Sequence, residues 1–468
     1  MSSAMPDAEV LDATLHAALR TGGDFAEVFI EDRRNCRAGF DDGRIEELVS
    51  GRSRGAGIRV RAGASVGFAH TTELSPAGLR EAARVAAAAA RAGGVQQPGR
   101  PLNRQDAPAP NEVAAAPDTV AKARKVDLLR TAEEAARAEG SAIFQVACTY
   151  GDSRRRILVA NSDGLMSADE QVKTFFSVSV DAAGDAGKQN GRETRGHTVG
   201  FELFDTVDVA DLARTAARRA LRKLEAVPAP SGTMPVVIGA GGGGVLFHEA
   251  CGHGLEADHI HKDVSVFAGR IGEQVANPMV TLIDDGTMPG EWGCYAIDDE
   301  GRPAQRNVLI ADGVLVDYMW DRLRADREGR DASSGNGRRQ SYQHLPMVRM
   351  TNTYIANGNS EPDDIVADTP NGVYVAHLGG GQVNTATGDF VFGMTEAYLI
   401  EDGRLTAPIR EGNLIGNGPD VLMLIDALGN DFAMGSPGMC GKDGQGVPVG
   451  DGTPTLRVQR LTVGGTAA

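Results

Sequence analysis

The sequence predicts an α+β protein in which an N-terminal region of two helix–strands–helix units precedes a β-rich C-terminal domain that carries the active-site helix. Its 468 residues exceed what one ordinary hydrophobic core holds. Its 60 glycines and an aromatic content of only 5% indicate many turns and close backbone approaches, which favour β structure. Stretches rich in Pro and Gly interrupt the chain twice, at 93–117 and at 226–232. We therefore expect four segments: an α+β unit (1–95), a linker (96–117), a second α+β unit (118–230) and a β-rich domain (231–468).

The first unit has a helix at each end and strands between them. Apolar residues recur at helical spacing until Gly22 and Gly23, which end the first helix. Ser75 and Pro76 are start signals for an Ala-rich helix, and Asp42 precedes a glycine in a turn signal. The expected elements are a helix at 7–21, strands at 25–31, 57–61 and 65–69, and a helix at 76–92.

The second unit repeats this pattern with little similarity residue by residue. Ser162-Asp-Gly164 predicts a turn, and we interpret the run from Arg154 to Arg156 as a solvated turn rather than a nucleic-acid patch. The linker before this unit is interpreted as an irregular connection without chemistry. The expected elements are an amphipathic helix at 118–138, strands at 142–150, 156–161 and 172–180, and a basic helix at 206–225.

The C-terminal domain is predicted from hairpin signals. Asp-Gly pairs flanked by apolar runs at 308–316 and 397–405 predict two β-hairpins. Only one helix is expected, the one that contains His248. Four glycines, Gly241 to Gly244, precede it, but no Lys-Ser/Thr follows them, so we interpret them as a close backbone approach rather than a phosphate-binding loop. Such bare backbone beside a helix could bind an extended peptide.

Composition excludes several functions. The net charge of −16 disfavours a general binder of phosphate backbones. The five cysteines are odd in number and far apart, which suits a reducing cytoplasm better than a disulfide framework. We find no signal-peptide pattern and no apolar run of about 18 residues that would span a membrane. We therefore expect a cytoplasmic protein without membrane or nucleic-acid partners.

Two histidines and a carboxylate lie within one short stretch, His248-Glu249-Ala-Cys-Gly-His253. Two imidazoles can hold a zinc ion, and an adjacent glutamate can accept a proton from water. The histidines are five residues apart, however, and a regular helix separates such side chains by about 140°. The site therefore requires a distorted helix. Gly252 has the freedom to permit this, and we predict a π-type turn or a break at 251–254.

The third ligand has to come from elsewhere in the chain. Cys251 lies between the histidines, but its side chain should point away from theirs, so we interpret it as a small buried hydrophobe. Cys440 is the better candidate because it lies in a glycine-lined loop where a thiolate could meet a cation. The group that stabilises the oxyanion stays open, with His344, Tyr318 and His259 as possibilities.

These motifs resemble those of a known family. The stretch from His248 to Asp258 resembles the HExxxH motif of the TldD branch of the TldD/PmbA metallopeptidases, and Gly438-Met-Cys-Gly-Lys-Asp-Gly-Gln resembles that family's C-terminal cysteine loop. Further resemblance covers nearly the whole chain and includes the segments 157–164, 349–352 and 411–418. The resemblance implies zinc on His248, His253 and Cys440, with Glu249 as the catalytic base.

It also implies a function. Family members cleave peptides and unstructured segments, often as a pair of a TldD-type chain and a zinc-less PmbA-type chain. We therefore expect a zinc-dependent peptidase that uses a glutamate base on short or unfolded polypeptides and forms a homodimer or a heterodimer with a PmbA-type paralogue. The alternatives are a catalytically silent scaffold subunit, a nucleic-acid or topoisomerase modulator, and a cysteine hydrolase that uses Cys251 or Cys440.

Overall fold

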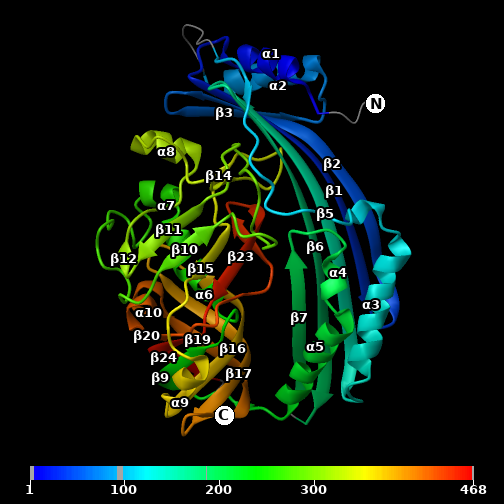
Figure 1. The fold of residues 1–468 in the computed structure, drawn as a ribbon, viewed down its shortest axis with the longest axis vertical. Coiled ribbons are helices and arrows are strands. Elements are labelled where there is room, and N and C mark those ends of the chain that lie inside the picture. The colour runs from blue at the N-terminus through cyan, green and yellow to red at the C-terminus, as the bar shows by residue number, and fades with distance from the viewer. Residues whose placement is uncertain (1–4, 92–98, 186, 466–468) are drawn as a thin grey trace.

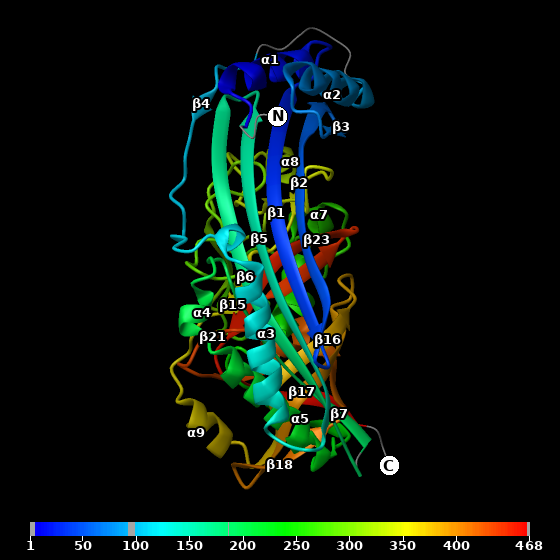
Figure 2. The ribbon, with the colours of Figure 1, turned by 90° about the vertical axis from the view of Figure 1, so that its right-hand side faces the viewer.

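The computed structural model describes residues 5–91, 99–185 and 187–465. A tall, curved N-terminal sheet carries helices on its outer face, and the C-terminal domain packs against its inner face (Figures 1 and 2). Helices and strands are both abundant, and the α+β class and its order are as predicted. The N-terminal elements are α1 (Ala8–Leu19), β1 (Phe25–Asp41), β2 (Arg44–Ala62), β3 (Ser65–Thr71), α2 (Pro76–Ala89), β4 (Asn103–Arg104), a 3₁₀ turn (Pro117–Thr119), α3 (Lys122–Arg137), β5 (Ile143–Asn161), β6 (Leu165–Gly184), β7 (Gly187–His197), α4 (Leu203–Thr206) and α5 (Val209–Leu224).

Both predicted helix–strands–helix units are present, and they share one sheet. The strand order is β3-β2-β1-β5-β6-β4, with β7 also paired to β6. The units meet where β1 runs antiparallel to β5, in register from Glu27 with Asn161 to Asp41 with Ala147. The domain boundaries given above stay a prediction, because a shared sheet does not define where a unit ends.

Alternation along β1 explains the layers. Val28, Ile30 and Phe40 point toward the helices and are buried in the cores beneath α1 and α2 or beneath α3 and α5. Phe29, one residue out of phase, instead packs with Tyr342 of the C-terminal domain. Because successive strand side chains face opposite sides, one sheet has one face for its own helices and the other for the second domain.

The prediction of a solvated turn at Arg154–Arg156 is wrong, because β5 runs unbroken through these residues. Arg155 is buried on the face toward the C-terminal domain, where its guanidinium lies 2.6 Å from Glu31 and 2.8 Å from Asp299. Buried ion pairs of this kind place charged residues where the alternating strand pattern would otherwise have apolar ones. The strands predicted from the apolar pattern are therefore shorter than β5 and β6. The polar strand β7 was missed for the same reason.

The C-terminal domain has two large sheets around the largest core, a two-stranded sheet of β13 and β14, and several short helices. Its strand orders are β12-β11-β10-β15-β23-β21, with β22 on β23, and β16-β9-β24-β19-β17-β18-β8, with β20 on β24. Its elements are β8 (Val227–Pro228), β9 (Gly232–Ile238), α6 (Gly244–Phe247), a π turn (His248–Gly252), a 3₁₀ turn (His253–Leu255), α7 (Ala257–His261), β10 (Leu282–Asp285), β11 (Arg306–Ala311), β12 (Val314–Leu315), α8 (Arg322–Glu328), β13 (Gly337–Arg338), β14 (Met347–Val348), β15 (Asn352–Ile355), α9 (Pro362–Ala367), β16 (Asn371–Val383), β17 (Asp389–Glu401), β18 (Arg404–Arg410), β19 (Gly412–Asn417), α10 (Gly418–Leu424), β20 (Ile425–Leu428), β21 (Ala433–Met434), β22 (Gly438–Lys442), β23 (Gln445–Thr453) and β24 (Leu456–Gly465).

Both predicted hairpins are present, joining β11 to β12 and β17 to β18. Asp312 and Gly313 have φ angles of 47° and 82°, the left-handed conformation that a tight two-residue hairpin turn requires. The expectation of a single helix is wrong, since α8, α9 and α10 are also present. They have six or seven residues each, too few to produce a periodic signal.

The glycine run before α6 is a close backbone approach, as predicted. Gly241 adopts a left-handed φ of 68°, and a side chain at Gly242 would collide with the carbonyl oxygen of Ala376.

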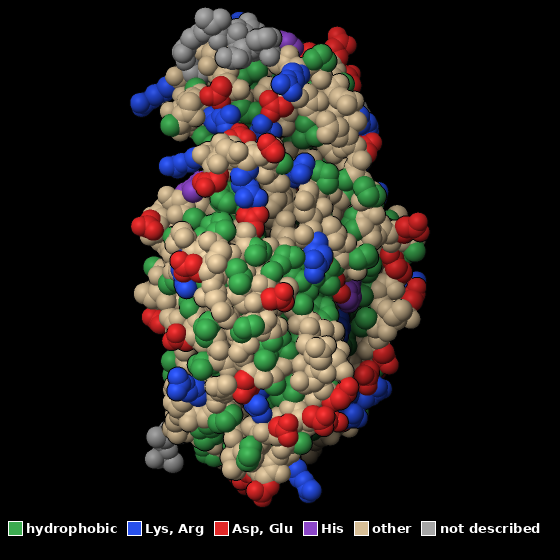
Figure 3. Space-filling view, turned by 60° about the vertical axis from the view of Figure 1, so that its left-hand side comes forward, with side chains coloured by type: hydrophobic (Ala, Val, Ile, Leu, Met, Phe, Trp, Pro, Cys, Tyr) green, Lys and Arg blue, Asp and Glu red, His purple; other side chains and the backbone are tan. Residues whose placement is uncertain are grey.

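On the outer face of the C-terminal domain, hydrophobic side chains are spread over the middle and charged ones concentrate toward the ends (Figure 3). Across the described ranges, no helix combines the length and the apolar character needed to cross a membrane.

Candidate metal centre

Three side chains from distant parts of the chain converge in the C-terminal domain. One ligand atom from each of His248, His253 and Cys440 lies within 4.8 Å of the others, and all three residues are buried. The two imidazoles come from the chain between α6 and α7, and the thiol comes from β22. The structure therefore brings together the three residues that the sequence nominated.

A wide turn places the two histidines side by side. The chain passes from α6 into a π turn over His248–Gly252, closed by the amide of His253 donating to the carbonyl of His248, and then tightens into a 3₁₀ turn. The imidazole centroids are 5.3 Å apart and the rings are nearly perpendicular. The predicted π-type turn is thus present, but it begins at His248 instead of residue 251. A hydrogen bond that spans five residues brings residues five apart onto one side.

Gly252 has a different role from the one predicted. Its φ of −57° and ψ of −49° are ordinary right-handed helical angles, which any residue adopts. A Cβ atom at residue 252 would instead collide with the sulfur of Met350. Glycine is therefore required because the turn packs directly on Met350, and not because the backbone adopts angles that only glycine allows.

Cys440 reaches the histidines from β22, which pairs with β23. Its Sγ lies 3.3 Å from Nε2 of His253. Burial opposes ionisation of this thiol, but His248 and His253 outweigh it and lower the pKa of Cys440 to about 4. The cysteine is therefore a thiolate at neutral pH, which is the form that binds a metal ion.

Residues that the sequence did not single out hold His253 in place. Its Nδ1 lies 2.8 Å from Oε2 of Glu256, which leaves Nε2 to face Cys440. Lys442 Nζ donates to Glu256 at 3.0 Å and to Asp258 at 2.7 Å. Burial opposes ionisation of Glu256, but Lys442 and His253 outweigh it and lower its pKa. Their proximity in sequence to His253 and Cys440 was the available signal.

The donor set fits a metal ion. Neither ring nitrogen of His248 has a hydrogen-bond partner among the described residues, although the side chain is 3% exposed. Buried polar atoms are rarely left without a partner in native proteins. Two imidazoles and a thiolate are ligands that zinc accepts, and a carboxylate hydrogen-bonded to a ligating histidine is the usual outer partner.

Replacing Glu256 by glutamine is expected to weaken zinc binding by about 10–100-fold, because the neutral amide no longer enforces the orientation of His253. Competition against a chelator of known affinity measures this change. Glu273→Gln is the matched control, because Glu273 is exposed and pairs with Arg270 at the surface. Equal zinc affinities in the two variants would show that Glu256 does not position His253.

Glu249 lies beside the cluster and remains accessible. Its side chain is 31% exposed, and its Oε2 is 3.7 Å from Nε2 of His253. A neighbouring carboxyl, Asp451, was not anticipated. Burial raises the pKa of Asp451 to about 6, with nearby His248 opposing the shift and Glu249 adding to it. Asp451 and Val245 both line a cavity of about 640 Å³.

The other candidates do not join the cluster. Cys251 is fully buried in the domain core, as predicted, and burial raises the pKa of its thiol. The Tyr318 hydroxyl donates to the carbonyl of Phe267, and His259 bonds to the carbonyl of His253. His344 bonds to the Ser341 hydroxyl. Structural hydrogen bonds thus occupy all three residues considered for the oxyanion.

Known proteins match along almost the whole chain. Family models described as domain 1, the central domain and the C-terminal domain of PmbA/TldA metallopeptidases match residues 26–90, 115–224 and 231–465. A metalloprotease TldD homologue from Haemophilus influenzae is 40% identical over 456 residues, covering 95% of this chain and 93% of that one. A metalloprotease from Methanothermobacter thermautotrophicus is 35% identical, covering 95% and 96%.

Solved structures share the fold. A Thermotoga maritima protein described as a modulator of a DNA gyrase has a TM-score of 0.80 at 20% identity and covers 97% of this chain and 99% of its own. TldE from Thermococcus kodakarensis has a TM-score of 0.76 at 21% identity, covering 95% and 97%. The matching family models and the relatives named metalloprotease define a family of metallopeptidases. The chain belongs to the PmbA/TldD family, and relatives named as TldD homologues match 95% of it.

Proposed function

We propose that this protein is a zinc-dependent peptidase that hydrolyses peptide bonds in short or unfolded polypeptides. The observation that carries the proposal is the buried cluster of His248, His253 and Cys440 beside the partly exposed Glu249. Imidazole and thiolate ligands suit zinc better than they suit magnesium or calcium. Bound there, zinc would supply a Lewis acid that polarises the scissile carbonyl and lowers the pKa of a water to about 7.

The protein's own residues divide the remaining work. Glu249 accepts the proton from the attacking water and later delivers a proton to the leaving amine. Its side chain is 31% exposed, so it is accessible to a substrate. Glu256 and Lys442 keep His253 oriented toward Cys440, so that the ligand set is held before substrate arrives.

The substrate cavity favours an extended chain. Glycine is the most frequent residue type lining the cavity of about 640 Å³ beside Asp451, with Gly241, Gly242, Gly379, Gly380 and Gly435 among the residues there. Main-chain hydrogen bonds to such backbone bind an extended peptide with little preference for sequence. A folded protein cannot present its backbone in this way, so short and unfolded polypeptides are the expected substrates.

We further propose that the protein acts in the cytoplasm as a homodimer or with a PmbA-type paralogue, without nucleic acid. All five cysteines are free thiols, which a reducing compartment preserves. The net charge of −16 disfavours nucleic acid. Shared fold with TldE from Thermococcus kodakarensis supports a paired assembly. Light scattering of the protein alone and after mixing with its paralogue tests this.

The alternative is a catalytically silent scaffold subunit, and the intact ligand cluster with its glutamate favours the enzyme. We expect one zinc per chain by metal analysis, and we expect a chelator to abolish cleavage of an unstructured peptide and lower the Tm. Bound metal stabilises a fold by RT ln(1 + [L]/Kd), about 4 kcal/mol at a thousandfold excess over Kd. Adding zinc back should restore both. Zinc-free protein that cleaves the peptide at the full rate would refute the proposal.

A further inference from the structure

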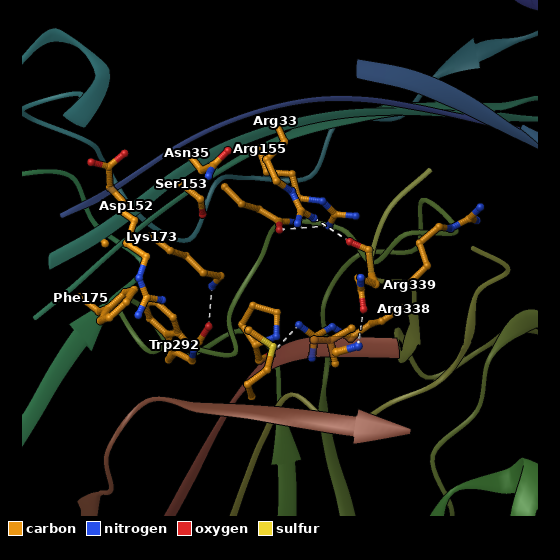
Figure 4. A pocket seen from close by; sticks show the side chains of 18 of the residues that line it. Arg33, Asn35, Asp152, Ser153, Arg155, Lys173, Phe175, Trp292, Arg338 and Arg339 are labelled. Carbon is orange, nitrogen blue, oxygen red and sulfur yellow. Dashed lines mark hydrogen bonds between the residues drawn. The ribbon is translucent and has the colours of Figure 1, made fainter. Parts of the chain in front are cut away.

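A second cavity, here called the basic cavity, lies between the N-terminal sheet and the C-terminal domain (Figure 4). Its volume is about 420 Å³, within the range of small-ligand sites. Side chains from β1, β5 and β6 enter it from the sheet, and Arg338 faces them from the other side. The cationic residues that line it are Arg33, Arg37, Arg155, Lys173, Arg338 and Arg339.

Two of these cations are buried without a carboxylate partner. Lys173 is 6% exposed, and its Nζ donates to the hydroxyl of Thr198 and to the carbonyl of Trp292. Arg338 is also 6% exposed, and it donates to the carbonyls of Met350 and Pro448. Within the described ranges neither forms an ion pair. Burial lowers the pKa of Lys173 to about 8, as expected for an ammonium without a counter-charge.

Elsewhere in this chain, buried cations are paired. Arg59 contacts Glu27 and Glu300, each at 2.8 Å, and Lys125 contacts Asp152 at 2.6 Å. The exceptions among the described residues are Lys173, Arg338 and Arg349. Arg349 donates to the carbonyls of Gln445 and Cys440, so it lies against the same β22–β23 hairpin that closes the basic cavity. Unpaired positive charge is therefore concentrated around this one site.

The other four cations that line the cavity are paired with carboxylates. Arg155, for example, is 9% exposed and pairs with Glu31 and Asp299. Two carboxylates, Asp152 and Asp299, also line the cavity, and they are paired with Lys125 and Arg155. A buried charge is costly unless it is paired, so the geometry favours an anionic ligand.

The position of the cavity identifies the ligand. Met439 lines it, whereas the next residue, Cys440, lies in the ligand cluster, so the two sites occupy opposite faces of β22. Trp292 lines both the basic cavity and the glycine-lined cavity beside Asp451. Phe175 and Pro448 add apolar wall. An anion carried by a peptide that passes Trp292 fits this arrangement, and the net charge of −16 repels larger polyanions.

We propose that the basic cavity binds a carboxylate of the peptide substrate, from its C-terminus or an acidic side chain, while the scissile bond lies at the metal centre across the β22–β23 hairpin. This proposal rests on the proposed peptidase function and adds a substrate preference to it. Lys173 and Arg338 supply the charge. Cationic donors form the stronger hydrogen bonds to carboxylates.

The proposal can be tested without cleavage by measuring, with calorimetry, how tightly matched pentapeptides bind to the zinc-loaded Glu249→Gln protein. The probes are acetyl-Ala₄-Leu with a free carboxylate, the same peptide as an amide, and an amide with Glu in place of Leu. We expect the free acid to bind about tenfold more tightly than the amide. If the Glu amide binds as tightly as the free acid, the site accepts side-chain carboxylates. If the Glu amide binds only as tightly as the Leu amide, the site is specific for the C-terminal carboxylate.

Lys173→Met in the same background is expected to remove the difference between acid and amide without lowering the Tm, because it removes an unpaired buried charge. Arg219→Met is the control: Arg219 is buried and paired with Glu193, and neither residue lines the basic cavity, so this variant should lower the Tm and leave the acid-to-amide ratio unchanged. Lys173→Gln replaces Lys173→Met if the latter fails to fold. The proposal is overturned if the parent protein binds the acid and the amide equally. It is also overturned if inorganic phosphate competes with the acid and binds more tightly than the acid does. Failure of the proposed peptidase function is detected separately, because the wild-type protein would then not cleave the peptides.

Discussion

Glu249→Gln is expected to lower kcat for peptide hydrolysis by about 10²–10⁴-fold, the usual contribution of a positioned general base. Glutamine has nearly the same shape but cannot accept the proton from water. The residue is outside the ligand cluster, so zinc content should stay at one per chain. Steady-state cleavage of a fluorogenic unstructured peptide, together with metal analysis of the same samples, measures both quantities.

Glu249→Asp is the matched control for this prediction. It keeps a carboxylate but moves it away from His253 and the ligand cluster, so a smaller loss than that of the glutamine variant is expected. Wild-type kcat in the glutamine variant would rule out Glu249 as the base. Equal losses in the two variants would indicate that the position of the carboxylate matters as much as its charge.

Cys440→Ser is expected to abolish both zinc retention after dialysis and peptidase activity. The neutral serine hydroxyl replaces a thiolate whose low pKa is maintained by His248 and His253. The loss of zinc affinity should exceed the about 10–100-fold effect expected for Glu256→Gln, because a direct ligand is removed. Metal analysis after dialysis against a weak chelator separates the two variants.

Cys251→Ala is the control for Cys440→Ser. Cys251 lies between the two histidines but its side chain is in the core, away from the ligand cluster. We expect the alanine variant to keep zinc and activity, with a stability loss of about 1 kcal/mol for the lost sulfur packing. Loss of activity with zinc retained in Cys251→Ala would instead support a cysteine hydrolase that uses this thiol.

Much of the fold was predictable where the signal is local. Asp312-Gly313 and the corresponding pair at the β17–β18 turn specify hairpins, because few residue pairs adopt left-handed angles easily. The break between β5 and β6 at Ser162–Gly164 was equally clear. The long strands were harder to predict, because Arg155 and Lys173 interrupt the apolar pattern. Their partners, such as Glu31 and Trp292, lie in other elements far along the chain.

By itself, the sequence determined the metal motif, the need for a wide turn between His248 and His253, and Cys440 as their companion. These follow from spacing and side-chain chemistry, which act within one turn or one loop. Only the tertiary structure decided that Glu256 and Lys442 brace His253, that Gly252 makes room for Met350, and that unpaired cations gather behind the β22–β23 hairpin. Such contacts join segments distant in the chain, and no local pattern records which buried charge finds a partner.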